Sequence, residues 1–202
     1  MNEYAILSIH GSIILIGVIL MTPFGDVLGG FLVNKWPSTA TKRGRMLAGL
    51  MMVCTGGFTV SAQTLWMHNK LSEGGSVCSG SELLNCDGLI GNPDYNTVPF
   101  IGQPWGLLGM VAFCLLLWLA ITVAKEPLAL STQTFLKAGL GATIAGLPVI
   151  GLLVSYEIKE GLICPFCTAA HIANVIAMVG FILLLRMYES EEWAPELKKT
   201  RK

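Results

Sequence analysis

The chain has 202 residues, of which 53% are apolar and only 13% charged, and its mean hydropathy is +0.64; soluble domains differ strongly from these values. Its formal net charge is zero, so no global field attracts nucleic acid or an acidic substrate. The composition predicts a membrane protein and argues against nucleic-acid binding.

Five apolar segments follow one another along the chain. The first, Tyr4–Met21, is broken by Pro-Phe-Gly-Asp at residues 23–26. Glu3 argues against a secretory signal there, because such a signal begins with basic residues, so we expect this segment to be retained as a span. The other four clearly reach the roughly 20 residues that a helix needs to cross a bilayer. They are Met46–Trp66, Trp105–Ala124, Thr134–Tyr156 and Cys164–Met187.

The basic residues predict the orientation, because Lys and Arg gather on the cytoplasmic side of membrane proteins. With the N-terminus outside and the C-terminus inside, only Lys70 and Lys159 of the 13 basic residues lie on the outer side. The remaining basic residues are Lys35, Lys42, Arg43, Arg45, Lys125, Lys137, Arg186, Lys198, Lys199, Arg201 and Lys202. We therefore expect residues 67–103 and 157–163 to lie outside the cytoplasm.

The long outer segment, residues 67–103, carries turn-forming residues at positions 72–76 and 91–94. Between them, Ser81–Asn85 is long enough for one helical turn. We expect the outer segment to fold back over the bundle as a lid.

Six cysteines divide into two groups. Cys54 and Cys114 stand singly in apolar runs, where a lone cysteine usually packs as a small hydrophobic residue. The other four fall in or beside segments expected outside the cytoplasm, where disulfides form and persist. These candidates for redox chemistry are Cys78, Cys86, Cys164 and Cys167.

The late pair lies in Cys164-Pro165-Phe166-Cys167, and its i, i+3 spacing puts both sulfurs on one helix face within disulfide reach. Pro165 suits a first helical turn, and the positive end of the helix dipole there stabilises a thiolate. The motif favours thiol–disulfide exchange over a structural disulfide or half of a zinc site. His171 could face the same groove, although a histidine in a span more often only packs.

Cys78 and Cys86 are eight positions apart in the outer segment. A disulfide between them could merely restrict the lid. Alternatively, the pair could meet a soluble partner and then pass electrons to the CxxC pair through a mixed disulfide. No residues indicate haem, flavin or iron–sulfur binding, so a quinone in the bilayer, held in an apolar pocket beside Cys167, is the expected electron acceptor.

From about Arg45 to Met187 the chain resembles the vitamin K epoxide reductase family, including its bacterial disulfide-forming members. The resemblance rests on the two cysteine pairs in their order, Asp87 after the second loop cysteine, Gly102-Gln103-Pro104 and Gly109. It implies a four-helix bundle in a bacterial inner or plasma membrane. In that bundle Cys78 exchanges with a partner protein, Cys86 relays to Cys164, and Cys167 lies against ubiquinone or menaquinone.

Two stretches depart from that family pattern. Residues 91–96 replace a serine-containing stretch that members often have, so Asn85, Asn92 or Asn96 could supply a quinone contact instead. Together with Cys167, we name His171 and Asn92 as candidate quinone contacts, and no metal ligands. The N-terminal span is additional to the four-helix unit and could contact another subunit. Because only a short tail follows Met187, we expect the thioredoxin-like partner to be a separate chain.

The expected organisation is an all-α integral membrane protein. An additional N-terminal segment (residues 1–44) precedes a four-helix domain (45–188), and a charged cytoplasmic tail (189–202) follows it. The expected function is quinone-coupled oxidation of an extracytoplasmic thioredoxin-like protein, which supports disulfide formation outside the cytoplasm. Two alternatives stay open: a non-catalytic structural subunit of a larger membrane complex, and reduction of vitamin K epoxide by the same route of electrons.

Overall fold

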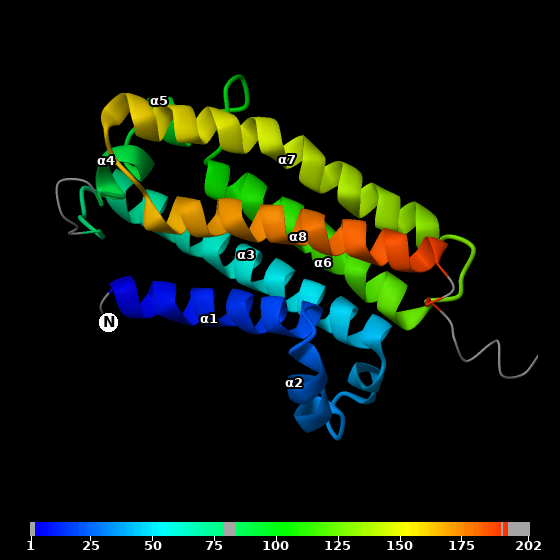
Figure 1. The fold of residues 1–202 in the computed structure, drawn as a ribbon. Coiled ribbons are helices and arrows are strands. Elements are labelled where there is room, and N and C mark those ends of the chain that lie inside the picture. The colour runs from blue at the N-terminus through cyan, green and yellow to red at the C-terminus, as the bar shows by residue number, and fades with distance from the viewer. Residues whose placement is uncertain (1–2, 79–83, 191, 194–202) are drawn as a thin grey trace, which may run out of the picture.

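The computed structural model describes residues 3–78, 84–190 and 192–193, and every secondary-structure element assigned in this part of the chain is a helix. Five long helices pack lengthwise against one another (Figure 1). They are α1 (Glu3–Met21), α3 (Lys42–Ser72), α6 (Trp105–Lys125), α7 (Thr132–Glu160) and α8 (Pro165–Glu189).

Four of these helices, α3, α6, α7 and α8, are each long and apolar enough to cross a membrane. A fifth candidate is the bent pair formed by α1 and the short helix α2 (Gly25–Leu32), whose axes differ by 105°. This arrangement confirms the expected all-α membrane bundle with an additional N-terminal helix. The chain is an integral membrane protein.

The helices extend a few residues beyond the apolar segments that predicted them. α3 begins at Lys42, where Thr41 Oγ1 accepts a hydrogen bond from the Gly44 N–H at 3.0 Å, a typical N-cap. α7 continues to Glu160 and ends where Gly161 takes a left-handed conformation with φ 65°. Polar residues thus lengthen the helices at both membrane surfaces.

The N-terminal helix α1 is tightly joined to the bundle. Gly17 of α1 and Gly49 of α3 allow the two backbones to meet: a Cβ atom on Gly17 would lie 2.7 Å from the Gly49 carbonyl oxygen. Small residues permit this close approach between membrane helices, where packing supplies much of the attraction. α1 therefore packs as an integral part of the helix bundle.

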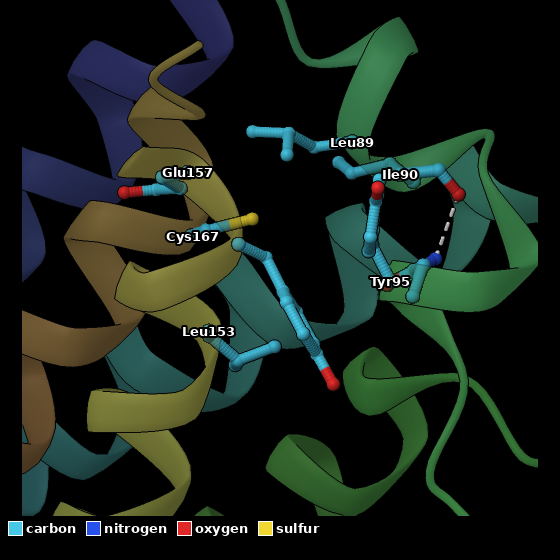
Figure 2. Close-up of a pocket in the computed structure, with 8 residues that line it drawn as sticks. Leu89, Ile90, Tyr95, Leu153, Glu157 and Cys167 are labelled. Atoms are coloured by element: carbon cyan, nitrogen blue, oxygen red, sulfur yellow. Dashed lines mark hydrogen bonds between the residues drawn. The ribbon is translucent and has the colours of Figure 1, made fainter. Parts of the chain in front are cut away.

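The outer segment folds into two short helices, α4 (Asp87–Ile90) and α5 (Pro93–Asn96), at the end of the bundle where α7 ends and α8 begins (Figure 1). In Figure 2, Leu89 and Tyr95 face Leu153 of α7 across a small space. The helical turn expected at Ser81–Asn85 lies mostly outside the described residues, and Leu84 and Asn85 are not helical.

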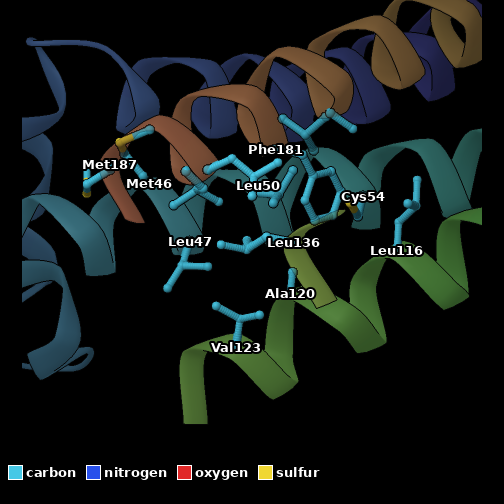
Figure 3. Packing of buried hydrophobic residues seen from close by; sticks show 14 of the residues in the cluster. Met46, Leu47, Leu50, Cys54, Leu116, Ala120, Val123, Leu136, Phe181 and Met187 are labelled. Carbon is cyan, nitrogen blue, oxygen red and sulfur yellow. The ribbon is translucent and has the colours of Figure 1, made fainter. Parts of the chain in front are cut away.

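The main hydrophobic core lies between α3, α6, α7 and α8 (Figure 3). Leu50, Leu136 and Phe181 are fully buried there, and Cys54 packs among them with no exposed surface, which confirms its expected packing role. Cys114, in contrast, is exposed on α6, so the same expectation was wrong for it. Apolar neighbours alone did not reveal which side of the helix faces outward.

Candidate active site

The CxxC pair opens the last helix. Pro165 is its first residue, where a missing N–H costs nothing, and Cys164 precedes it as the N-cap in an extended conformation. The Cys164 sulfur accepts a hydrogen bond from the Cys167 N–H at 3.2 Å, and the two sulfurs are 2.6 Å apart. Cys164 is fully buried, whereas Cys167 is partly exposed. Only the second sulfur is open to the surroundings.

The loop pair, Cys78 and Cys86, lies at the same end of the bundle. Asn85 donates its N–H to the Ile163 carbonyl at 3.2 Å, and a parallel bridge joins Leu84 to Ile163. This short backbone pairing brings Cys86 beside Cys164, close enough for the two thiols to interact. The thiol of Cys86 also interacts with that of Cys78.

The four sulfurs therefore form a continuous series, which we call the sulfur series. Its order is Cys78, Cys86, Cys164 and Cys167, and each member contacts the next. All four are free thiols in this structure. Neighbouring thiols can exchange a disulfide by attack of one sulfur on the next, so the series can carry two electrons from one end to the other.

Asp87 holds the first member of the series in place. Its carboxylate accepts hydrogen bonds from the Cys78 N–H at 3.0 Å and the Ser76 hydroxyl at 2.6 Å, and both its oxygens lie 3.3 Å from the Val77 N–H. These bonds fix the chain that leads out of α3 against the start of α4. Cys78 is thereby kept next to Cys86.

Both loop thiols are poor acids in this setting. Burial raises the pKa of Cys78 to about 12, and contact with the Cys86 thiol adds to the effect. The pKa of Cys86 is raised by hydrogen bonding to Cys164 and then by burial. Because the thiolate is the reactive form, these raised pKa values disfavour reaction of either thiol in this arrangement.

A pocket lies at the far end of the series. Among its lining residues, Cys167 is the one cysteine, and Figure 2 shows its sulfur directed into the space between α4, α5 and α7. The cavity itself has a volume of about 30 Å³, inside a partly open space of about 290 Å³. Its walls are Leu89, Ile90, Tyr95, Asn96, Leu153, Tyr156, Glu157 and Cys167.

Polar groups in the pocket wall are tied to their neighbours. Asn96 is buried, and its amide donates to the Ile90 carbonyl at 2.8 Å and lies 3.0 Å from His68 Nδ1. Glu157 accepts the Cys164 N–H at 3.2 Å, and in Figure 2 its carboxyl turns away from the open space. The lining is thus mostly apolar with fixed polar groups, as in many ligand pockets.

The lid over this pocket is fastened at its rim. The Tyr95 hydroxyl donates to Glu160 at 2.6 Å, and the Tyr95 ring lies 5.1 Å from that of Tyr156. Lys159 stands over the Tyr95 ring at 5.3 Å. Together these contacts attach α5 to the end of α7.

The predicted site residues fall into two groups. The structure brings the four cysteines together, whereas His171 is half-buried one turn after Cys167 and does not line the pocket. Asn92 also lies off the pocket, because its side chain caps α5 by accepting the Asp94 N–H at 3.0 Å. Asn96, one of three asparagines considered, does line it.

Sequence reasoning missed Tyr95, Tyr156 and Glu157 as pocket residues. Their aromatic or acidic character at the outer end of a span was visible, but aromatic residues are common at membrane interfaces. Only the folding of α5 onto α7 distinguishes them.

The chain has no significant match among the curated proteins or among the solved structures. The model of the vitamin K epoxide reductase family matches residues 48–182, about two thirds of the chain. This is a family of oxidoreductases, and membership implies thiol–disulfide and quinone chemistry in general. The match begins within α3 and ends within α8, so it spans the whole sulfur series. The chain belongs to the vitamin K epoxide reductase family.

Proposed function

We propose that this chain is a membrane thiol:quinone oxidoreductase that oxidises a separate thioredoxin-like protein outside the cytoplasm. The observation that carries the proposal is the sulfur series, which runs without a gap from Cys78 to a pocket beside Cys167. A purely structural disulfide would need two neighbouring sulfurs, whereas four in sequence suit a relay.

In this scheme Cys78 is the entry point and Cys167 the exit. A partner thiolate attacks Cys78 of the Cys78–Cys86 disulfide and forms a mixed disulfide, releasing Cys86 as a thiolate. The second partner thiol then attacks the partner's own sulfur in the mixed disulfide. This releases the partner as a disulfide and leaves Cys78 as a thiol. Cys86 next attacks Cys164 of the Cys164–Cys167 disulfide. In each exchange one S–S bond breaks and one forms.

When Cys78 displaces Cys164 from Cys86, the loop disulfide is restored and the CxxC pair is left as a dithiol. The quinone supplies the final oxidising power, because it takes up two electrons and two protons to become a quinol. The net change is therefore one partner dithiol converted to a disulfide for each quinone reduced.

The residues around Cys167 suit a quinone ring by their chemistry. The cavity of about 30 Å³ is far smaller than a typical ligand pocket of roughly 300–1,000 Å³, so the ring would enter when the lid moves aside, with its apolar tail lying between helices. Tyr95 and Tyr156 offer aromatic faces, and the buried Asn96 offers a fixed polar group. These residues would orient the ring and keep water away from Cys167.

The proposed orientation has the N-terminus and the sulfur series outside the cytoplasm. It rests on the distribution of the basic residues, of which Lys70 and Lys159 alone lie at the outer ends of their helices. This placement supports a partner that carries disulfides, because disulfides form and persist in oxidising compartments.

The test measures quinone reduction by the purified chain in lipid vesicles, with a reduced thioredoxin-like protein as electron donor. We expect Cys167→Ser and Cys164→Ser to abolish turnover, and Cys164→Ser to leave the loop pair able to exchange with the partner. Cys114→Ser is the matched control, since Cys114 is exposed on α6 away from the series. A normal rate with Cys167→Ser would refute the mechanism.

The same assay separates the two alternatives. A structural subunit would hold the fold without dithiol-dependent quinone reduction and would co-purify with other chains in fixed stoichiometry. The observation that favours this alternative is the N-terminal portion through Leu47, which lies outside the family match and includes α1. An epoxide reductase would accept electrons from the same series but turn over vitamin K epoxide.

A further inference from the structure

The helix α2 leaves the bundle at a sharp angle. α1 has 19 residues, so it is about 28 Å long and comparable to the hydrocarbon thickness of a bilayer. After the break at residues 22–24 the chain turns by 105° into α2, which points away from the long axis of the bundle (Figure 1). If α1 spans the membrane, α2 therefore lies nearly parallel to its surface.

Contacts with the start of α3 fix how α2 is rotated about its own axis. Asp26 forms an ion pair with Arg45, whose aliphatic chain passes over Gly29: a Cβ there would lie 2.4 Å from Arg45 Cδ. Thr39, in the short helix η1 (Pro37–Ala40), donates its hydroxyl to the Gly29 carbonyl at 3.2 Å. The glycine side of α2 thus faces the protein.

The opposite side of α2 is apolar and uncovered. Phe24, Val27 and Phe31 occupy positions i, i+3 and i+7, which form one stripe on a helix. Their exposed fractions are 77%, 69% and 80%. Lys35 and Trp36 follow at its end, both exposed, and such residues are typical of the boundary between lipid and water.

We infer that this stripe, Phe24, Val27 and Phe31, is a membrane-surface anchor that inserts into the acyl-chain boundary of the lipid bilayer. Its occupant is lipid rather than a second copy of the chain, because α1, from which α2 bends, also exposes apolar side chains. On α1, Leu15 is 59% exposed. In Figure 1, η1 lies beyond α2 in the direction in which α1 runs, so the free side of α2 faces back along α1.

The anchor lies at the end of the bundle away from the sulfur series. α3 starts beside α2 and runs for 31 residues, about 46 Å, before Cys78 follows its last turn. An anchor at this end would fix the depth of α3 in the bilayer. It would thereby fix the position of the sulfur series relative to the opposite membrane surface. This role is independent of whether the relay turns over.

The test is photocrosslinking with p-benzoylphenylalanine placed at Val27, in protein reconstituted into phosphatidylethanolamine and phosphatidylglycerol vesicles. Replacement of Leu15 on α1 is the positive control, and replacement of the exposed Ser38 on η1 is the matched control. We expect lipid adducts by mass spectrometry at 27 and 15, with at least tenfold less at 38.

Lipid capture at 15 with none at 27 would overturn the inference, as would a chain-to-chain adduct at 27 as the main product. A second measurement does not depend on photochemistry: Val27→Asp should lower the fraction of folded chain recovered from vesicles, while Ser38→Asp should not. Equal recovery of both variants would also contradict the anchor.

Discussion

Replacing Asp87 with alanine should loosen the entry to the sulfur series. The carboxylate receives hydrogen bonds from the Ser76 hydroxyl at 2.6 Å and the Cys78 N–H at 3.0 Å, besides the longer contacts to Val77. Hydrogen bonds to a charged group are worth roughly 1.5–3 kcal/mol each, and partial solvent exposure reduces that value. We therefore assign about 2 kcal/mol of stabilisation to the hydrogen bonds from Ser76 and Cys78 together.

That free energy bears on how readily the loop pair closes into a disulfide. With Asp87 in place, Cys78 is already held beside Cys86, so little ordering remains to be done when the bond forms. In the Asp87→Ala variant, Cys78 must first be brought into place when the disulfide forms. This cost in free energy disfavours the disulfide, which is therefore easier to reduce. For a two-electron couple, about 2 kcal/mol corresponds to a reduction potential about 40 mV less negative.

The assay is equilibration of the loop pair against glutathione buffers, with alkylation and mass spectrometry to count free thiols. Cys164→Ser and Cys167→Ser are introduced first, so that the loop pair is measured alone. Asp87→Asn keeps an acceptor oxygen and should shift the potential by less than half as much. Asp94→Asn, on α5 outside this network, is the control. If Asp87→Ala behaves like Asp94→Asn, the carboxylate does not position Cys78.

Three further outcomes are expected. Because burial raises the pKa of Cys78 to about 12, its alkylation rate should keep rising about tenfold per pH unit beyond pH 10; a plateau near pH 9, as for a free thiol, would contradict this. Gly17→Leu should lower the Tm in detergent by about 5 °C, since its Cβ would meet the α3 backbone, whereas Gly11→Leu, with nothing within 4 Å, should change it little. Tyr95→Phe removes the hydroxyl bond to Glu160 and should raise amide hydrogen exchange across residues 92–98 about fivefold, with residues 132–145 unchanged; equal exchange in α5 would show that this bond does not hold the lid.

Much of the fold was predictable because bilayer thickness and helix geometry leave few choices. The four long apolar segments and the position of Pro165 at the first turn of α8 follow from local rules. Cys114 shows where those rules end. An apolar run does not reveal which side of a helix faces its neighbours, and this cysteine proved to be exposed.

The pocket depended on contacts that span distance in the sequence. Tyr95 meets Tyr156 and Glu160 only because α5 folds onto the end of α7. The sequence predicted Asn92 as a candidate quinone contact, with Asn96 only as an alternative. One became a helix cap and the other a buried wall of the pocket, through the one-turn geometry of α5.

The sulfur series depends both on local spacing and on contacts between residues far apart in the sequence. Spacing alone was enough to pair Cys164 with Cys167, since a single helical turn joins them. No spacing rule brings Cys86 to Cys164, because 77 residues and two membrane helices separate them. A bridge from Leu84 to Ile163 accomplishes it, in residues that carry no chemistry of their own. Substitutions at such backbone positions could thus interrupt the relay while leaving every cysteine in place.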